Sequence, residues 1–202
     1  MVSTPSGAGS PPGPSTPPPV VAERVDGAAA ADPALRAELL RLWVDVTNAG
    51  GAVGFVPPVG PADVEPALER SLDAVRRGGE SALVLREGER VVAVGYLRRN
   101  EAAIMRHWAW VVKLMVDPAR QGRGLGLRAL RELHAHALDL GLEAVRLTAR
   151  GGLGLEAFYA RAGYVEVGRV PRAIRVGPGD DRDDVVLLHE LDRPLDQGAA
   201  RP

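Results

Sequence analysis

Three glycines at alternate positions, Gly122, Gly124 and Gly126, lie between an apolar stretch and an amphipathic one. Backbone N–H groups at the start of a helix have no partner inside that helix and lie at the positive end of its dipole. Because glycine carries no Cβ, an anion can approach such a backbone closely. Positive charge nearby comes from three arginines, Arg120, Arg123 and Arg128. These residue types predict binding of a diphosphate-sized anion, and so of a phosphate-bearing cofactor.

The spacing distinguishes between kinds of phosphate-binding loop. A Walker loop ends in Gly-Lys-Ser/Thr, whereas the only lysine of this chain, Lys113, precedes the glycines. A dinucleotide-binding loop has the order Gly-x-Gly-x-x-Gly, usually with an acidic residue closing the next strand, and the strand expected here ends at Thr148. The segment Gln121–Gly126 instead resembles the Gln/Arg-x-x-Gly-x-Gly/Ala loop of the GNAT superfamily of N-acetyltransferases.

That resemblance implies that the loop holds the pyrophosphate of acetyl-CoA, the cosubstrate. The residues that it assigns to the cofactor are Gln121, Gly122, Arg123, Gly124, Leu125 and Gly126. The alternative is a tight connection between a strand and a helix that binds nothing. The flanking apolar strand, the Asp117-Pro118 turn and the following helix favour the cofactor.

A second segment, Gly154–Tyr164, resembles the Ala-x-x-Phe-Tyr-x-x-x-Gly-Phe/Tyr segment of the same superfamily. In those enzymes this helix packs beside CoA and its tyrosine lies near the thioester sulfur. The resemblance therefore makes Tyr159 the candidate general acid for the leaving thiolate. The alternative is that Phe158 and Tyr159 are core aromatics at the end of an amphipathic helix.

Over about residues 20–192 the chain is also similar to the tabtoxin-resistance type of GNAT protein. The segments that carry this likeness are Gly51–Phe55, Lys113–Val116 and Val167–Pro171. The chain departs from that type near the acceptor site, where Trp110 and Thr148 replace expected acidic residues and Asn48 replaces a histidine. The acceptor of that type is therefore not transferred. A small-molecule amine is the expected substrate, with peptide or protein amines as the alternative.

In a GNAT-type reaction an amine attacks the acetyl carbonyl directly in a ternary complex. The protein must align the two reactants, stabilise the oxyanion and move two protons. Where the strand 107–116 separates from the strand 143–148, backbone groups at Leu114, Met115 and Val116 are expected to bond the pantetheine arm and the thioester oxygen, aided by a β-bulge.

His107 is the first candidate for the base, because its ordinary pKa of about 6.5 allows it to accept a proton near neutral pH. The alternatives are Glu101, a chain of water molecules, or an exposed strand-end histidine with no role. His134 and His136 are two apart on one helix and face different directions, and His189 is alone in the last strand. No metal site is predicted.

Two features near the expected acceptor site each allow two interpretations. Trp108 and Trp110 share one side of their strand if it has no bulge, and they belong either to the core or to the wall of the acceptor pocket. The acidic run 180–184 is expected to join the last two strands, where it either attracts a cationic amine or forms a solvated turn.

The chain has 202 residues, of which 46% are hydrophobic, and this suits one globular domain with a proper core. A formal net charge of -1 gives no electrostatic case for nucleic acid or an anionic membrane as partner. The absence of cysteine removes disulfides, thiolate nucleophiles and zinc–thiolate sites. No apolar run approaches the roughly 20 residues of a membrane span and no signal-peptide pattern is present, so a cytoplasmic protein is expected.

The elements that must position these residues follow the order β-α-α-β-β-β-α-β-α-β-β. This is the order of the GNAT fold, an α/β (α+β) architecture with a mixed central sheet of about seven strands. Hydrophobic periodicity and glycine or proline punctuation predict helices from Pro33 to the glycines at 50 and 51, and over 61–77, 124–140 and 153–162. The same signals predict strands over 20–25, 81–86, 90–98, 107–116, 143–148, 164–170 and 185–191. The strand 107–116 is almost wholly apolar and is expected to be central in the sheet.

Residues 1–19 are Pro, Ser, Gly and Thr almost throughout, which predicts a disordered tail with polyproline-II character. The GNAT domain is predicted over 20–195, followed by a flexible C-terminus over 196–202. A homodimer through the last strand, 185–191, is one possible assembly. An acetyl-CoA-binding sensor or regulatory module without turnover is the competing function, because fold does not guarantee chemistry.

Overall fold

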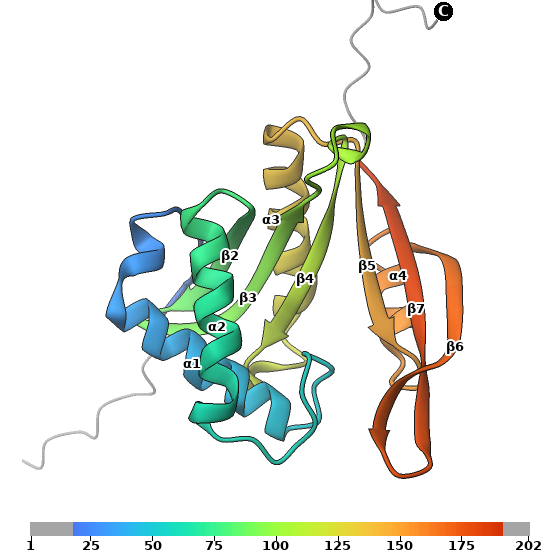
Figure 1. The fold of residues 1–202 in the computed structure, drawn as a ribbon. Helices are drawn as coiled ribbons and strands as arrows, with labels where there is room; N and C mark the ends of the chain where they lie inside the picture. Colours follow the sequence, from blue (N-terminus) through green and yellow to red (C-terminus); the bar gives the residue numbers. More distant parts are fainter. Residues whose placement is uncertain (1–17, 192–202) are drawn as a thin grey trace, which may run out of the picture.

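A seven-stranded sheet forms the centre of the computed structural model, which describes residues 18–191 (Figure 1). The strands are β1 (Val20–Val25), β2 (Glu80–Glu87), β3 (Arg90–Arg99), β4 (Trp108–Val116), β5 (Ala144–Arg150), β6 (Val165–Gly177) and β7 (Asp180–Glu190). Their order in the sheet is β1-β2-β3-β4-β5-β7-β6, and only β4 and β5 run parallel. The sheet is therefore mixed, with β4 in the middle, as the apolar character of that strand predicts.

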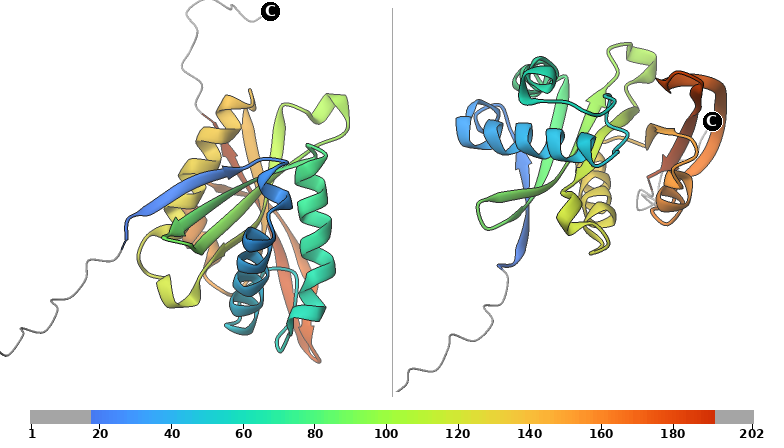
Figure 2. Two further views of the ribbon diagram at one scale, coloured as in Figure 1. Left: turned by 90° about the vertical axis from the view of Figure 1, so that its left-hand side faces the viewer. Right: turned by 90° about the horizontal axis from the view of Figure 1, so that it is seen from below.

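Helices cover both faces of this sheet (Figure 2). Between residues 18 and 191 the α-helices are α1 (Pro33–Asn48), α2 (Pro61–Arg76), α3 (Leu125–Asp139) and α4 (Leu155–Ala160), with 3-10 turns at Ala29–Ala31, Ala103–Met105 and Pro118–Arg120. α1 and α2 pack on one face, and α3 and α4 pack on the other. Along the chain these elements follow the predicted order β-α-α-β-β-β-α-β-α-β-β.

The start of α1 shows how local chemistry sets an element. The Asp32 side chain accepts a hydrogen bond from the Ala34 amide at 2.9 Å, and Pro33 occupies the first helical position, where its missing N–H costs nothing. The apolar stripe of the helix then faces the sheet, where Leu39 and Trp43 are buried. Local residue types therefore set both the start of α1 and the face that it buries.

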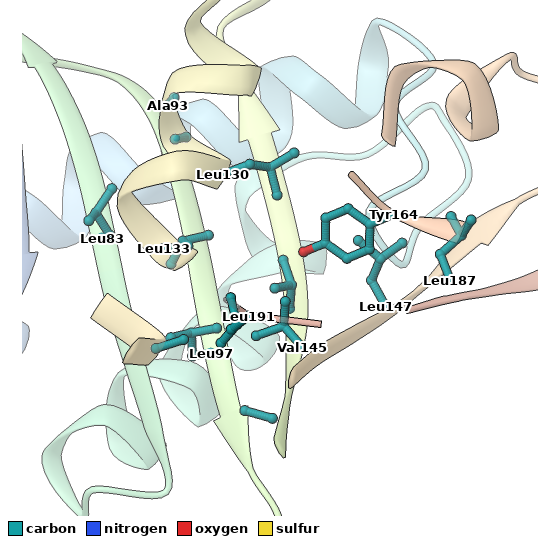
Figure 3. Packing of buried hydrophobic residues seen from close by; sticks show 14 of the residues in the cluster. Leu83, Ala93, Leu97, Leu130, Leu133, Val145, Leu147, Tyr164, Leu187 and Leu191 are labelled. Atoms are coloured by element: carbon teal, nitrogen blue, oxygen red, sulfur yellow. The ribbon is translucent and has the colours of Figure 1, made fainter. Parts of the chain in front are cut away.

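On the opposite face, Leu130 and Leu133 of α3 pack against Leu83 and Leu97 of the sheet (Figure 3). The helix comes so close to β3 that Gly95 has no room for a side chain. A Cβ at this position would lie 2.6 Å from Cδ1 of Leu133. This close packing brings the N-terminus of α3 beside the end of β4, and so it positions the glycine loop between them.

β4 separates from β5 halfway along its length (Figure 1). The two strands pair only from Trp108 to Trp110 on β4. On the other side of β4, Val94 pairs with Met115 while Tyr96 pairs with Val112, so β4 carries one extra residue there. The extra residue is a bulge, and a left-handed φ of 54° at Lys113 accompanies it. The predicted separation and bulge are both present.

The two last strands are longer than the sequence predicts. The acidic run 180–184, expected to join them as a turn, lies within β7 instead. Cross-strand pairing explains this difference, because Asp181 pairs with Arg175 at 2.6 Å and Asp183 pairs with Arg169 at 3.2 Å. Opposite charges facing each other across the hairpin offset the poor strand propensity of aspartate. The run is therefore neither a solvated turn nor a free anionic patch.

Both edges of β7 are occupied, by β5 on one side and by β6 on the other. A second chain therefore has no free edge of β7 at which to add a strand, and a homodimer through 185–191 stays a prediction. The outer strand at this end of the sheet is β6, where Val165, Val167 and Val170 are exposed.

Predictions for the chain termini lie mostly outside the described residues. The proline-rich segment 1–19 is described only at residues 18 and 19, and neither the last residues of the predicted domain, 192–195, nor the C-terminus 196–202 is described. Among residues 18–191, no helix is both long and apolar enough to span a bilayer.

Candidate active site

The loop before α3 presents unpaired backbone donors. Gly122 and Gly124 have left-handed φ values of 77° and 78°, and a Cβ at either position would meet nothing within 4 Å. The first amide to bond back along the helix is that of Arg128, which reaches the Gly124 carbonyl at 3.0 Å. Within residues 18–191 no acceptor bonds the amides of residues 122–127. These amides can therefore bind an anion, as the sequence predicts.

Gly126 has a different role from the other two glycines. A Cβ there would lie 2.9 Å from Cζ of Phe158 and 3.5 Å from Cγ2 of Val116. The missing side chain thus allows α3 to pack against α4. The Gly126 amide still faces the cavity side of the loop as one of the unpaired amides, and Phe158 adds a second reason for glycine at this position.

Two of the arginines near the loop are held by a carboxylate. The guanidinium groups of Arg120 and Arg123 lie 2.8 and 3.2 Å from Glu87 at the end of β2, whose side chain is 6% exposed. The hydrogen bond from Arg120 holds the pKa of Glu87 below its ordinary value. Arg120 and Arg123 therefore tie the loop to the sheet, and Arg128, which has no carboxylate partner within residues 18–191, is the unbalanced cation.

A cavity of about 480 Å³, the loop cavity, opens beside the glycine loop. The residues predicted to bind the cofactor that line it are Leu114, Val116, Gln121, Gly122, Gly124, Leu125 and Gly126. The two remaining predicted residues do not line it. The Met115 side chain is 1% exposed and lies in the core on the α1 and α2 face, and the Arg123 side chain bonds Glu87.

The start and end of α4 form the far wall of the loop cavity. Gly154 and Leu155 lie within the segment whose resemblance places it beside the cofactor, whereas Leu153 precedes it. Arg161 is a lining residue that sequence reasoning missed, although its place two residues after Tyr159 was a usable signal. Its guanidinium lies 5.8 Å from the centre of the Phe158 ring and adds positive charge to this cavity.

A second cavity of about 1020 Å³, the wide cavity, lies where β4 and β5 separate. Its walls come from the loop 51–60, α2, four strands and α4. Trp110 and Thr148, the residues found in place of acidic ones, both line it, while Trp108 is buried beside Trp110 with ring centres 5.1 Å apart. The residues common to both cavities are Ala52, Val53, Leu114 and Tyr159. The two cavities therefore meet at the gap in the sheet.

Tyr159 lies at this meeting point. Its ring packs edge-on against Phe158 and Tyr164, with centre distances of 5.0 and 5.6 Å. Its hydroxyl bonds nothing within residues 18–191, and burial raises the pKa of Tyr159 to about 12. The hydroxyl is therefore protonated at neutral pH and available as a donor in the gap.

Comparison with known families shows to which family a chain with this arrangement belongs. The sequence profile described as the Acetyltransferase (GNAT) family matches residues 54–164, more than half of the chain. The chain belongs to the GNAT family of acetyltransferases. It is therefore an acyltransferase that uses acetyl-CoA, and the matched range contains the glycine loop, β4 and Tyr159.

Solved structures share this GNAT fold. Ribosomal-protein-alanine N-acetyltransferase from Brucella melitensis is 18% identical, with a TM-score of 0.66 over 85% of this chain and 99% of that one. YncA from Salmonella typhimurium, solved with its cofactor acetyl-CoA, is 17% identical, with a TM-score of 0.67 over 90% and 99%. An N-acetyltransferase from Staphylococcus aureus is 12% identical, with a TM-score of 0.67 over 86% and 99%. At these identities the likeness shows the α+β GNAT fold, which confirms the predicted architecture.

The candidate bases of this GNAT protein lie in different places. His107, the first candidate base, is exposed just before β4, where its carbonyl accepts a 2.7 Å hydrogen bond from the Glu143 amide, and it lines neither cavity. The carboxylates that line the wide cavity are Glu80 and Glu101. Tyr159 and Glu101, the alternative candidate, therefore line the same cavity, and His107 lies outside it.

Glu80 belongs to a buried ionic network. Its side chain is 5% exposed, and its oxygens accept hydrogen bonds from Lys113 at 2.9 Å and Arg98 at 2.8 Å. The Lys113 ammonium also donates to Ser71 Oγ at 2.8 Å and lies 4.7 Å from the centre of the Tyr96 ring. Burial lowers the pKa of Lys113. No sequence motif indicated this network, because its members are dispersed along the chain.

Two other histidines of this GNAT protein, His134 and His189, contact Gly163 and Tyr164, which follow α4. His134 bonds the Tyr164 hydroxyl through Nε2 at 3.0 Å and stacks on His189 with ring centres 4.4 Å apart. Burial lowers the pKa of His134 to about 4, with a smaller contribution from His189. These contacts fix Tyr164, which packs on Tyr159. Within residues 18–191 no group of three or more histidine, aspartate or glutamate side chains is placed to hold a metal ion.

Proposed function

We propose that this GNAT protein transfers the acetyl group of acetyl-CoA to a primary amine of a small molecule, by direct attack in a ternary complex. The observation that carries this proposal is the meeting of two cavities at Leu114 and Tyr159. One cavity leads to unpaired amides suited to a diphosphate, and the other is open to an acceptor. Two reactants bound from opposite sides would be held in line at the gap.

Each part of the proposed site has a distinct task. The amides of residues 122–127 bind the pyrophosphate, and the free backbone edge of β4 at Leu114 and Val116 bonds the pantetheine arm and the acetyl oxygen. The amine nitrogen attacks the carbonyl carbon and the C–S bond breaks. Because a thiol has a pKa of about 8.5, below that of Tyr159, the tyrosine hydroxyl stabilises the departing thiolate by a hydrogen bond.

The proton lost by the amine needs an acceptor. We assign this role to Glu101, directly or through water, because it lines the wide cavity and its carboxylate has no ion-pair partner within residues 18–191. Glu80 is less suited, since its oxygens are bonded to Lys113 and Arg98. The proton passes through solvent to the thiolate and so completes free CoA.

The test is release of free thiol from acetyl-CoA in the presence of amines, amino acids, aminoglycosides and peptides. Gly124→Leu fills the space above the loop, and Gly179→Leu is its matched control. Both glycines have a positive φ and open surroundings, but Gly179 lies in the β6–β7 turn and lines neither cavity. Both variants carry a similar backbone strain of about 1–2 kcal/mol.

We expect Gly124→Leu to weaken acetyl-CoA binding by about 100-fold or more, and Gly179→Leu to leave it unchanged, when both are measured by calorimetry. Equal binding by the two variants would contradict the assignment of the loop. Retained acetyl-CoA binding without thiol release from any amine would favour the competing reading, a sensor module without turnover.

A further inference from the structure

The wide cavity carries more positive than negative side chains, although the chain as a whole is close to neutral. Its cationic residues are Arg70, Arg98, Arg99 and Lys113, and its anionic residues are Glu80 and Glu101. Four cations against two carboxylates leave a formal excess of two positive charges. A cavity of this sign attracts an anionic group and repels a polycation.

Two of these cations already have a carboxylate partner. Arg98 and Lys113 bond the buried Glu80 at 2.8 and 2.9 Å. Arg70 and Arg99 have no carboxylate partner within residues 18–191. Arg70, in α2, and Arg99, at the end of β3, are therefore the cations of this cavity that no carboxylate within residues 18–191 holds.

Arg70 is unpaired although α2 is rich in carboxylates. Those carboxylates are bonded elsewhere: Glu65 and Glu69 pair with Arg36 of α1, Asp73 pairs with Arg76, and Asp63 caps the helix by accepting from the Gly60 amide. Each of the other charged side chains of α2 thus has a hydrogen-bond or ion-pair partner, whereas Arg70 has none within residues 18–191. Its neighbour in the chain, Ser71, accepts a hydrogen bond from Lys113, and Arg70 itself is an exposed residue on the wall of the wide cavity.

The field of Arg70 extends into the cavity. The pKa of Lys113 is lowered mainly by burial, and Arg98 and Arg70 lower it further. Glu80 opposes this lowering of the Lys113 pKa, whereas Arg70 itself has no carboxylate partner within residues 18–191. An arriving oxyanion would bond a guanidinium whose charge is otherwise unbalanced, and the planar donors of arginine suit a carboxylate.

We infer that the acceptor is an amine that also carries an anionic group, such as the carboxylate of an amino acid, and that this group docks on Arg70 with support from Arg99. The inference rests on the proposed acetyl transfer and adds the class of acceptor. The anion then lies at the α2 wall of the wide cavity, and the amine points toward Glu101 and Tyr159. Polyamines and aminoglycosides are poor acceptors because they bring only positive charge.

The experiment compares each amino acid with its own primary amide, and adds spermidine as a polycation. Thiol release gives kcat and KM for wild type, Arg70→Gln, Arg70→Lys and the control Arg131→Gln. Arg131 is exposed on α3, lines neither cavity and has no carboxylate partner within residues 18–191. Kinetic constants are expressed per concentration of unprotonated amine, so the different amine pKa values of acids and amides do not bias the comparison between acceptors. Each variant is also compared with wild type on the same acceptor.

We expect amino acids to be better acceptors than their amides, and spermidine to be the poorest. Arg70→Gln should raise KM for amino acids about 10- to 100-fold with little change in kcat, because the lost bond positions the ground state and transition state alike. The same variant should change KM for amides by less than about threefold, Arg70→Lys should be intermediate, and Arg131→Gln should match wild type.

Preference for amides or spermidine, or an equal loss on acids and amides in Arg70→Gln, would overturn this inference while leaving acetyl transfer intact. Absence of thiol release from every amine, with acetyl-CoA still bound, would overturn the proposed function and this inference with it. The two failures are therefore distinguishable in one set of assays.

Discussion

The loop cavity and the wide cavity recognise their ligands in different ways. The loop cavity offers backbone amides from one short stretch, residues 122–127, and its glycines are needed for backbone shape and space. The wide cavity offers side chains from α2, β2, β3, β4, β5 and α4. Backbone recognition tolerates most side-chain changes nearby, whereas side-chain recognition changes with single substitutions. One fold can therefore keep its cosubstrate while its acceptor varies.

The largest effect is expected at the point that the two cavities share. Tyr159→Phe should lower kcat by about 100-fold or more while acetyl-CoA affinity stays near that of wild type, since the hydroxyl acts on the departing sulfur. Steady-state kinetics and calorimetry provide the measurements. Tyr96→Phe is the matched control, because the Tyr96 hydroxyl is buried without a hydrogen-bond partner among residues 18–191 and lines neither cavity. A similar loss of kcat in both variants would show that Tyr159 has no special role.

A second substitution should impair the function of the wide cavity without affecting the loop cavity. Glu80→Gln removes the carboxylate that neutralises Lys113 and Arg98, and leaving a buried cation unpaired costs about 3 kcal/mol of unfolding free energy. Acceptor turnover should fall with it, whereas acetyl-CoA affinity should stay within about twofold, because no member of the network lines the loop cavity. Urea unfolding and calorimetry test both parts.

The control for Glu80→Gln is Glu89→Gln, an exposed carboxylate in the β2–β3 turn. This variant should match wild type in stability and kinetics. If Glu80→Gln weakened acetyl-CoA binding as strongly as it impaired acceptor turnover, the two cavities would not be independent.

The smallest expected effect is on the pH dependence of the unfolding free energy. It arises from His134, which bonds the hydroxyl of Tyr164, the residue that packs on Tyr159. The folded protein keeps His134 neutral down to about pH 4, whereas the unfolded chain protonates a histidine near 6.5. The unfolded state therefore binds more protons between these values, so this contribution to stability is complete above 6.5 and is lost as pH falls toward 4. The loss amounts to at most about 3 kcal/mol.

Urea unfolding at several pH values measures this slope. We expect His134→Gln to flatten it between pH 6.5 and 4, and the exposed His107→Gln to leave it as in wild type. An unchanged slope in His134→Gln would mean that the stacked pair behind Tyr164 does not carry the pH response.

The sequence alone determined the order of the elements, the cap of α1 and the position of the glycine loop. Each of these depends on neighbours in the chain: Asp32 precedes Pro33, and the glycines fall between an apolar strand and an amphipathic helix. The open amides and the place of Tyr159 could be predicted for the same reason, since each lies in a contiguous motif. The central position of β4 also followed from its composition.

Tertiary structure decided what contiguous residues do not encode. It placed Glu101 in the wide cavity and His107 outside it, paired Glu80 with Lys113, and left Arg70 without a carboxylate partner in the described part of the chain, residues 18–191. It also placed the Phe158 ring close to Gly126 and included the acidic run 180–184 in β7. The physical reason is that these outcomes depend on contacts between residues far apart in the chain, whose strand register and helix packing arise only when the sheet is assembled.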